Sequence, residues 1–224
     1  MLNRGFVIKD GILERYRGWR RKIIIPKEVR IIGGWAFAYN QRITTVIIHD
    51  GVTKIEEGAF AECQNLTSVT IPDSVKEIEG WTFRLCQKLC DISLSENMVL
   101  GEDVLRGCKC LADENGFVSF KNILYGYFGN KKNIVVPNDI SKISGWAFYE
   151  NESLSQVIIP YGVNEIGYDA FRSCPNLTHI HIPVSLTKIA DTAFFESDKI
   201  VIHASMGSYT EQYAKENNIP FVAE

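Results

Sequence analysis

A repeat of 23 residues constrains the fold of this chain more than any other feature. Copies begin at Ile23, Val46, Val69, Ile134, Val157 and Ile180, and a degenerate copy, one residue shorter, begins at Ile92. Each copy carries an apolar alternation that usually ends at a proline, then V-x-x-I, an Ala-Phe pair and a late leucine. One such unit cannot bury its own apolar side chains, so neighbouring copies must stack, and the repeat predicts a solenoid.

A longer repeat is superimposed on the first. Residues 6–37 align without gaps to residues 117–148, and thirteen of the 32 positions are identical, so a unit of 111 residues is duplicated. Each duplicate opens with an expected hairpin, with turns at Asp10-Gly11 and Lys121-Asn122. The expected organisation is an N-terminal capping hairpin (1–22), a first array of about four repeats (23–116), a hairpin-like insert (117–133), a second array of about three repeats (134–203) and a C-terminal helical cap (204–224).

The third copy shows what each repeat must look like. Val69-Thr70-Ile71 alternates with period two and predicts a short strand, which Pro72 ends because it has no N–H for the ladder. Val75 and Ile78 then point inward, and a helical or 3-10 turn is expected to begin at Trp81. The fold class is therefore an α/β solenoid with short parallel strands on one side and short helical turns on the other.

Both ends of this solenoid need a cover. Tyr209, Tyr213 and Ala214 share one face of an expected helix, which would shield the apolar end of the last coil. The first hairpin is expected to do the same at the other end. The basic run from Arg15 to Lys22 belongs to that hairpin and is interpreted as a solvated cap.

One repeat position, three residues after each Ala-Phe pair or its equivalent, carries a small side chain with a hydrogen-bonding head. Its members, called the ladder below, are Asn40, Cys63, Cys86, Cys108, Asn151, Cys174 and Ser197. Such side chains, placed at a bend, can satisfy backbone groups that are buried inside the coil. The ladder is therefore predicted to be structural.

These features together resemble the BspA-like (Treponema pallidum type) leucine-rich repeats of bacteria. The resemblance rests on the 23-residue length, the Ile-Pro step and the A-F-x-x-C-x-x-L ending, and it covers about residues 23–203; the segment Gly207–Phe221 is similar to the closing segment of such proteins. It implies a right-handed superhelix with strands on its concave face, and a surface or secreted protein that adheres to host or matrix proteins. The N-terminus, MLNRGFVIKDG, does not predict a secretory signal peptide, so a cytoplasmic location is expected if it is the native start.

The six cysteines fall into two classes. Four occupy the ladder, where burial explains them and parallel Cβ vectors would suit a disulfide poorly. Cys90 and Cys110 lie off the ladder and are the thiols expected to react. A zinc site made of these two with Cys86 and Cys108 is a minority hypothesis, because the ladder already uses two of the four and paired C-x-x-C knuckles are absent.

Histidine suggests a second metal hypothesis. His179 and His181 stand two residues apart on one expected strand and so share a face. The neighbouring strands are expected to place Gln156, Ile158 and Lys199 beside them, which supplies no good third ligand. We therefore expect a polar pair on a binding face and no metal.

Catalytic and nucleic-acid functions find no support. His49 and His203 are assigned to the strand-ending position that proline takes in other copies, outside any acid–base constellation. No nucleophile elbow, zincin, Walker or dinucleotide motif occurs, so no catalytic residue and no cofactor are expected. A net charge of −3 argues against nucleic acid, and the apolar runs are too short to cross a membrane.

The outward strand residues form the candidate binding face. They are Thr45, Ile47, Ser68, Thr70, Asp91, Ser93, Asn133, Val135, Gln156, Ile158, His179 and His181. The mixture of small polar, β-branched and amide side chains suits recognition of another protein. The favoured function is a non-catalytic protein-binding module of adhesin type. The alternatives are an intracellular leucine-rich-repeat scaffold, a structural spacer in a larger surface protein and, least favoured, a metal-dependent enzyme.

Overall fold

The computed structural model describes residues 5–224, and residues 1–4 of the predicted N-terminal cap lie outside the described residues. The chain divides into two compact units, residues 1–112 and 113–224, called unit 1 and unit 2 below. The boundary falls just before the second copy of the duplicated segment. Each unit therefore contains its own hairpin followed by its own coils.

Both predicted hairpins are confirmed. In unit 1, β1 (Phe6–Lys9) pairs with β2 (Ile12–Tyr16), and in unit 2, β11 (Phe117–Phe120) pairs with β12 (Ile123–Tyr127). Each hairpin shifts register after its second residue, so even this irregularity is duplicated. Lys121 takes φ 53°, as Asp10 does at 50°, which allows the tight turn without a glycine at the first turn position.

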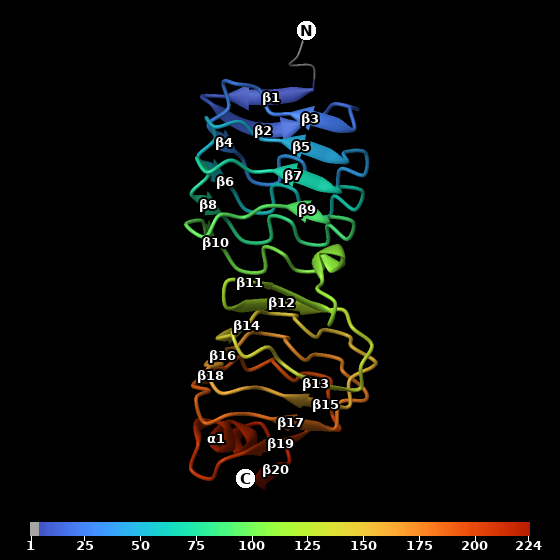
Figure 1. Cartoon of the computed structure of the whole chain (residues 1–224), viewed down its shortest axis with the longest axis vertical. Helices are drawn as coiled ribbons and strands as arrows, with labels where there is room; N and C mark the ends of the chain where they lie inside the picture. Colours follow the sequence, from blue (N-terminus) through green and yellow to red (C-terminus); the bar gives the residue numbers. More distant parts are fainter. Residues whose placement is uncertain (1–4) are drawn as a thin grey trace. The chain divides into compact units, whose positions relative to one another are not determined.

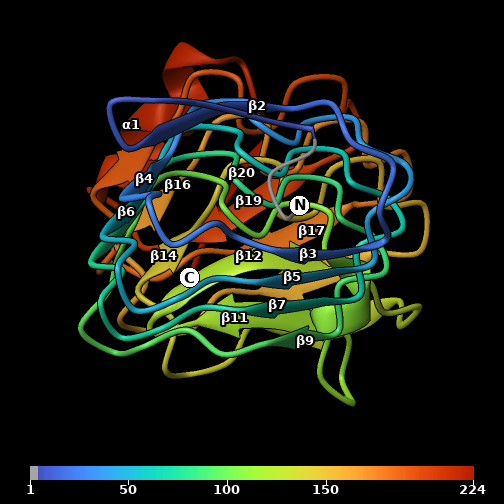
Figure 2. The same cartoon turned by 90° about the horizontal axis from the view of Figure 1, so that it is seen from above.

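Every coil of unit 1 contributes one long strand, of three residues except for two in the last coil, and one short strand of two residues. The long strands form one parallel sheet, composed of β3 (Lys22–Ile24), β5 (Thr45–Ile47), β7 (Ser68–Thr70) and β9 (Asp91–Ile92). The short strands continue the hairpin sheet in the order β1-β2-β4-β6-β8-β10, and they are β4 (Ile31–Ile32), β6 (Lys54–Ile55), β8 (Glu77–Ile78) and β10 (Val99–Leu100). Seen end-on, β5 and β7 lie on a different side of the coil from β4 and β6 (Figure 2).

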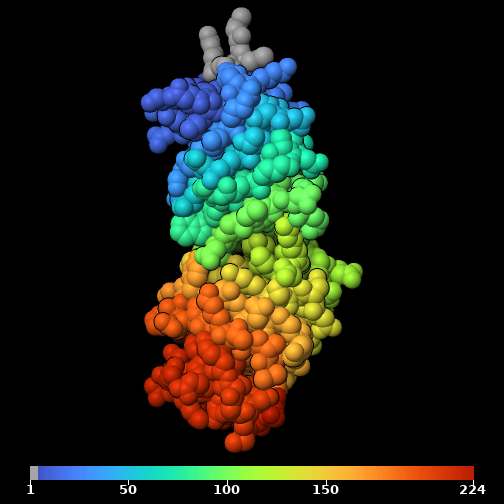
Figure 3. All heavy atoms as spheres, turned by 90° about the vertical axis from the view of Figure 1, so that its left-hand side faces the viewer, coloured from blue at the N-terminus to red at the C-terminus, as the bar shows by residue number. Residues whose placement is uncertain are grey.

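Unit 2 repeats this plan. Its long-strand sheet contains β13 (Asn133–Val135), β15 (Gln156–Ile158), β17 (His179–His181), β19 (Val201–Ala204) and β20 (Phe221–Ala223). Its short strands, β14 (Lys142–Ile143), β16 (Glu165–Ile166) and β18 (Lys188–Ile189), extend the hairpin β11-β12. Figure 1 shows the strands of each unit stacked in sequence order, and the coils of each unit follow one another in the same order on the surface drawn in Figure 3.

The third side of each coil differs from the predicted helical turns. After β4, Ala36 and Ala38 donate their N–H groups three residues back, as in a 3-10 turn, but Trp35, Phe37 and Tyr39 donate theirs to the next coil. Trp35 and Tyr39 hold φ near +60°, and this left-handed backbone interrupts any helix. Equivalent left-handed residues recur in the other coils, so the side consists of β-turns, and many of their N–H groups bond carbonyl groups of the next coil. Among residues 5–224 the only helices are the 3-10 turn η1 (Lys109–Leu111) and α1 (Tyr209–Glu216).

Columns of phenylalanine fill the interior. In unit 1, Phe37, Phe60 and Phe83 stack with ring centroids 4.9 and 5.5 Å apart, and Tyr16 of the hairpin covers the first ring at 5.3 Å. A second column in unit 2 follows the same order, from Tyr127 through Phe148 and Phe171 to Phe194. Burial of one such ring stabilises the fold by about 1.5–3 kcal/mol, which explains why the Ala-Phe pair persists through the repeats.

The predicted C-terminal helix is α1. Ser208 accepts a hydrogen bond from the Glu211 N–H at its start, and Tyr213 and Ala214 are buried against the last coil. Thr210 is also buried, whereas Tyr209 is 42% exposed and accepts the Ile189 N–H through its hydroxyl. In the described part of the chain, no helix has the length and apolar character that a membrane crossing requires.

Candidate functional site

The outward side chains of the long strands of unit 1, called the unit 1 strand face, lie in two straight rows. Parallel pairing aligns Thr45 with Ser68 and Asp91 in one row, and Ile47 with Thr70 in the other. The middle residue of each three-residue strand is buried, so the flanking residues point away from the core. The candidate residues of β5, β7 and β9 therefore lie side by side.

Sequence reasoning missed the first strand of this face and misplaced one residue. Lys22 and Ile24 of β3 pair with Thr45 and Ile47, and Ile24 is 57% exposed. Their offset of 23 residues from the next strand was a sufficient signal to include them. Ser93, in contrast, lies beyond β9, which ends at Ile92, so it is exposed but belongs to neither row.

The outward side chains of β13, β15, β17, β19 and β20 form the unit 2 strand face. One row aligns Asn133, Gln156 and His179, and the second aligns Val135, Ile158 and His181. Val135 is 54% and Ile158 is 39% exposed, so the second row begins with two apolar side chains in contact with water. The predicted residues of this face are brought together as expected.

His203 is where the structure corrects the sequence analysis. It does not end a strand in the proline position; it lies inside β19, directly beside His181 in the outward row. The neighbour of His179 is Val201 and not Lys199. The proline-position assignment counts the strand from Ile200, whereas Ile180 pairs with Ile202. The last coil is therefore 22 residues long, one fewer than the repeat period.

Glu224 completes a polar cluster at the end of this row. Its carboxylate lies 3.0 Å from His181 Nδ1 and 3.2 Å from His203 Nδ1. His203 Nε2 in turn lies 2.9 Å from His179 Nδ1. Burial, together with the neighbouring charge of His181, lowers the pKa of His203.

The ladder residues face the coil interior. The thiols of Cys63, Cys86, Cys108 and Cys174 each lie 3.1 Å from the phenylalanine carbonyl oxygen of the preceding coil, and the Ser197 hydroxyl donates to Phe171 O at 2.6 Å. Burial raises the pKa of Cys63 and Cys108 to about 12 and that of Cys174 to about 11. Burial also raises the pKa of Cys86. These four sulfurs therefore remain neutral thiols.

The two asparagines of the ladder work differently from the other members. Asn40 Oδ1 accepts the N–H groups of Arg42 and Ile43, and Asn151 Oδ1 accepts those of Ser153 and Leu154. Asn40 and Asn151 occupy the first coil of their units, which follows the hairpin and not another coil with an Ala-Phe pair. In these first coils the asparagine oxygen accepts N–H groups of the following bend, whereas in later coils the ladder residue donates to a phenylalanine carbonyl.

The two cysteines outside the ladder form a disulfide in unit 1. Cys90 and Cys110 are joined with a Cα–Cα distance of 5.0 Å, and η1 carries the second of them. The zinc hypothesis does not fit this arrangement, because these two sulfurs bond each other while the Cys86 and Cys108 thiols donate to carbonyl groups inside the coils. The sequence predicted that these two thiols would react, but it did not predict that they pair with each other.

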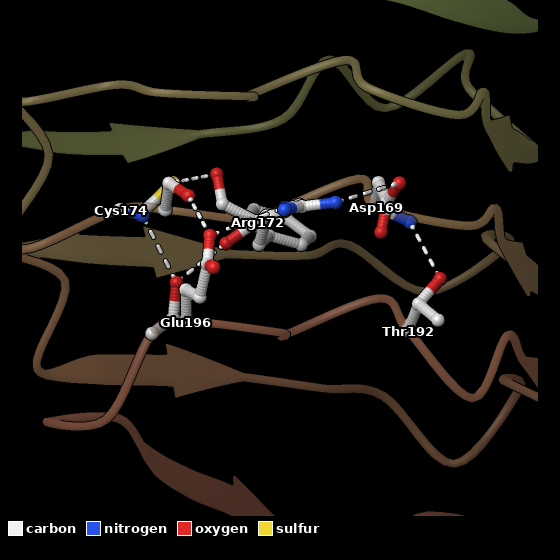
Figure 4. A network of polar contacts seen from close by, with 8 residues as sticks. Asp169, Arg172, Cys174, Thr192 and Glu196 are labelled. Atoms are coloured by element: carbon white, nitrogen blue, oxygen red, sulfur yellow. Dashed lines mark hydrogen bonds and ion pairs between the residues drawn. The ribbon is translucent and has the colours of Figure 1, made fainter.

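The turn side of unit 2 carries a separate polar network (Figure 4). Arg172 Nε lies 3.2 Å from Glu196 Oε2, which also accepts the Ser173 hydroxyl at 2.7 Å. Thr192 Oγ1 accepts the Asp169 N–H at 3.2 Å. Hydrogen bonds from Ser173 and Arg172 lower the pKa of Glu196. These three contacts each join one coil to the next, while Arg172 also pairs with Asp169 of its own coil at 3.7 Å, so the network ties successive turns together.

Sequence comparison places these features in a wider group. The chain matches the family model described as "BspA type Leucine rich repeat region", in six copies, over residues 19–133 and 120–214. No curated protein sequence matches it significantly.

Solved structures share the architecture at low sequence identity. A leucine-rich repeat protein from Eubacterium ventriosum ATCC 27560 is 18% identical, with a TM-score of 0.57 over 84% of this chain and 60% of that one. The T. pallidum leucine-rich repeat protein is 20% identical over 95% and 91% of the two chains, with a TM-score of 0.49. The pneumococcal vaccine antigen PcpA is 16% identical over 94% and 80%, also with a TM-score of 0.49. The first of these similarities supports the solenoid fold.

Proposed function

The chain belongs to the BspA-type leucine-rich repeat family, and from this premise we propose that it is a non-catalytic module that binds another protein through its strand faces. The observation that carries the proposal is the exposure of aligned β-branched side chains on a rigid sheet. Ile24, Val135 and Ile158 remain 57%, 54% and 39% exposed although each stands in a regular strand row. Exposed apolar groups that are aligned with polar neighbours are typical of protein-binding surfaces.

The partner class follows from the surface chemistry. The unit 1 strand face combines Ile24, Ile47, Thr70 and Ser68 with one cation and one carboxylate, so it has no concentrated charge. A backbone held by parallel pairing presents these groups with little loss of conformational entropy on binding. We propose a protein ligand of adhesin type, namely a host or matrix protein, and neither nucleic acid nor membrane.

The disulfide supports a location outside the cytoplasm. Disulfides persist in oxidising compartments and are rare in the cytosol, where thiols are kept reduced. Cys90–Cys110 therefore favours a surface or secreted protein over an intracellular scaffold. The scaffold and the structural spacer remain the competing functions that the experiment below separates.

A binding screen with face variants tests the proposal. The purified chain is presented to immobilised extracellular-matrix proteins and, separately, to lysate of its own cells. We expect matrix binding that weakens at least tenfold in Thr70→Lys or Ile158→Lys, because a buried lysine charge at an interface is costly. Thr53→Lys and Val184→Lys are the matched controls, since both positions are exposed but lie off the strand faces.

Three other outcomes would contradict it. Partners found only in the lysate would indicate the scaffold. The absence of any binding would indicate the spacer. Matrix binding that Thr53→Lys or Val184→Lys reduces as much as the face variants do would place the ligand elsewhere on the coils.

A further inference from the structure

The strongest unassigned feature is the cluster at the end of the unit 2 strand face. His181, His203 and Glu224 offer one ligand atom each, and the three atoms lie within 4.8 Å of one another. We propose that these three side chains form a binding site for a divalent first-row transition metal ion such as Zn²⁺. Two imidazoles and one carboxylate are a donor set that zinc and its neighbours prefer.

The separations between the donor atoms suit a metal ion. Glu224 Oε1 lies 3.0 Å from His181 Nδ1 and 3.2 Å from His203 Nδ1. Ligand bonds of 2.0–2.2 Å in tetrahedral geometry put neighbouring donor atoms about 3.4 Å apart. All three donor atoms lie within 4.8 Å of one another, so an ion fits between them once side-chain rotation brings each atom to bonding distance.

A second shell of hydrogen bonds orients both imidazoles. His181 Nε2 lies 2.9 Å from Gln156 Nε2, and His203 Nε2 lies 2.9 Å from His179 Nδ1. A half-turn of the Gln156 amide places its Oε1 at this position, as the acceptor that a protonated His181 Nε2 needs. With both Nε2 atoms engaged by neighbours, both Nδ1 atoms face Glu224. In metal-binding histidines an outer acceptor holds the N–H group and turns the other nitrogen towards the ion. His179 Nδ1 can accept from His203 Nε2 as it stands, and Gln156 can accept from His181 Nε2 once its amide has turned.

Regular backbone holds the three ligands in place. His181 stands in β17 and His203 in β19, which pair directly, and β20 pairs with β19 immediately before Glu224. The Glu224 N–H also bonds Ala204 O at 3.0 Å. The His203 side chain is 14% and the His181 side chain 25% exposed, so the imidazoles are sheltered while an ion would retain access from solvent. Sites built on paired strands hold their geometry better than sites on loops.

Metal titration of the full chain tests this site directly. The protein, prepared without a histidine tag and treated with a chelator, is titrated with Zn²⁺ by calorimetry and with Co²⁺ by visible spectroscopy. We expect one site per chain and a cobalt spectrum without a thiolate charge-transfer band. Glu224→Gln, His181→Asn and His203→Asn should each weaken binding at least tenfold, and Gln156→Ala should weaken it ten- to a hundredfold through the second shell.

Matched controls separate this site from other ligands. His49→Asn removes the one histidine of unit 1, and Glu152→Gln removes an exposed carboxylate of unit 2; both should bind as tightly as the unchanged chain. Circular dichroism checks that each variant is folded. If His203→Asn does not fold, the test relies on His181→Asn, because the His181 side chain is the more exposed of the two. Binding that survives in the ligand variants, a thiolate band, or no binding by the folded unchanged chain would overturn the proposal.

Discussion

The sulfur of Cys86 lies 3.1 Å from the carbonyl oxygen of Phe60, one coil earlier in the solenoid, and both groups are completely buried. This contact shows why the ladder carries cysteine or serine, and not a larger apolar residue, in the coils that follow another coil. The carbonyl group cannot reach water, so it requires a donor from within the protein.

Replacement of Cys86 should show this requirement. Cys86→Ala leaves the Phe60 carbonyl without its donor and should lower the free energy of unfolding by about 1–3 kcal/mol. Cys86→Ser keeps a donor, as Ser197 does in unit 2, and should cost less than Cys86→Ala. Urea unfolding followed by circular dichroism measures both. Equal losses in the two variants would mean that the size of the sulfur atom, and not its hydrogen bond, is what matters.

The raised thiol pKa values predict a loss of stability in alkali. The folded pKa of Cys63 and Cys108 is about 12, whereas an unfolded thiol titrates near about 8.5. Between about pH 8.5 and 12 the unfolded chain loses protons that the folded chain keeps. The contribution of these thiols to the free energy of unfolding is therefore complete below about pH 8.5 and is lost as the pH rises towards 12. Each thiol should contribute a slope of up to about 1.4 kcal/mol per pH unit.

A serine variant isolates this effect from other alkaline titrations. The triple variant Cys63→Ser/Cys86→Ser/Cys108→Ser removes the three ladder thiols of unit 1. Its free energy of unfolding should fall less steeply between pH 8 and 10 than that of the unchanged chain. The comparison uses urea midpoints at matched pH. Identical declines in both proteins would exclude the thiols as the cause.

The disulfide predicts a count of thiols and a stability difference. Six cysteines less the pair Cys90–Cys110 leave four thiols, so alkylation of the denatured, unreduced protein should add four labels, and six after reduction. With a separation of 20 residues, the link should stabilise the fold by about 3 kcal/mol. Mass spectrometry gives the count, and Cys90→Ser/Cys110→Ser gives the stability. Six labels without reduction would contradict the pairing in native material.

Gly58 should resist substitution more than Gly34. A Cβ at Gly58 would meet the Trp35 ring at 2.8–2.9 Å, and the backbone there has φ +61°. A left-handed backbone costs about 1–2 kcal/mol for a residue with a side chain, and the clash adds to it, so Gly58→Ala should cost at least about 2 kcal/mol. Gly34→Ala meets only one backbone oxygen at 3.4 Å and serves as the control. A similar small loss in both variants would mean that the indole moves aside freely.

Much of the fold could be predicted because its determinants repeat. The Ala-Phe pair, the Ile-Pro step and the Asp10-Gly11 turn act locally, and stacking multiplies each signal along the chain. The second sheet was not predicted, because strands such as Lys54–Ile55 contain two residues and are too short to show an alternation. The expected helical or 3-10 turns are present only as single 3-10-type hydrogen bonds, because left-handed residues such as Trp35 interrupt them, and a tryptophan gives no sign that its backbone is left-handed.

The polar cluster of unit 2 was beyond sequence analysis for a different reason. Its formation depends on the register of β19 and β20 against β17, and a shift of one residue turns every side chain to the opposite face. The Cys90–Cys110 pair likewise depends on where η1 places its second residue. Both contacts depend on how a coil folds back beside its neighbour, and the spacing of residues along the chain does not predict this.

The shortened last coil has a consequence for how such surfaces diversify. Counted by the 23-residue period, His203 falls in the buried row of Ile180; one residue fewer between Ile200 and Ile202 moves it to the outward row. Deletion of a single residue therefore shifts the register of a strand by one, and this shift exchanges interior and exterior side chains over the rest of the strand without any substitution. In a repeat protein of this kind, insertions and deletions can create new surface chemistry as directly as point mutations do.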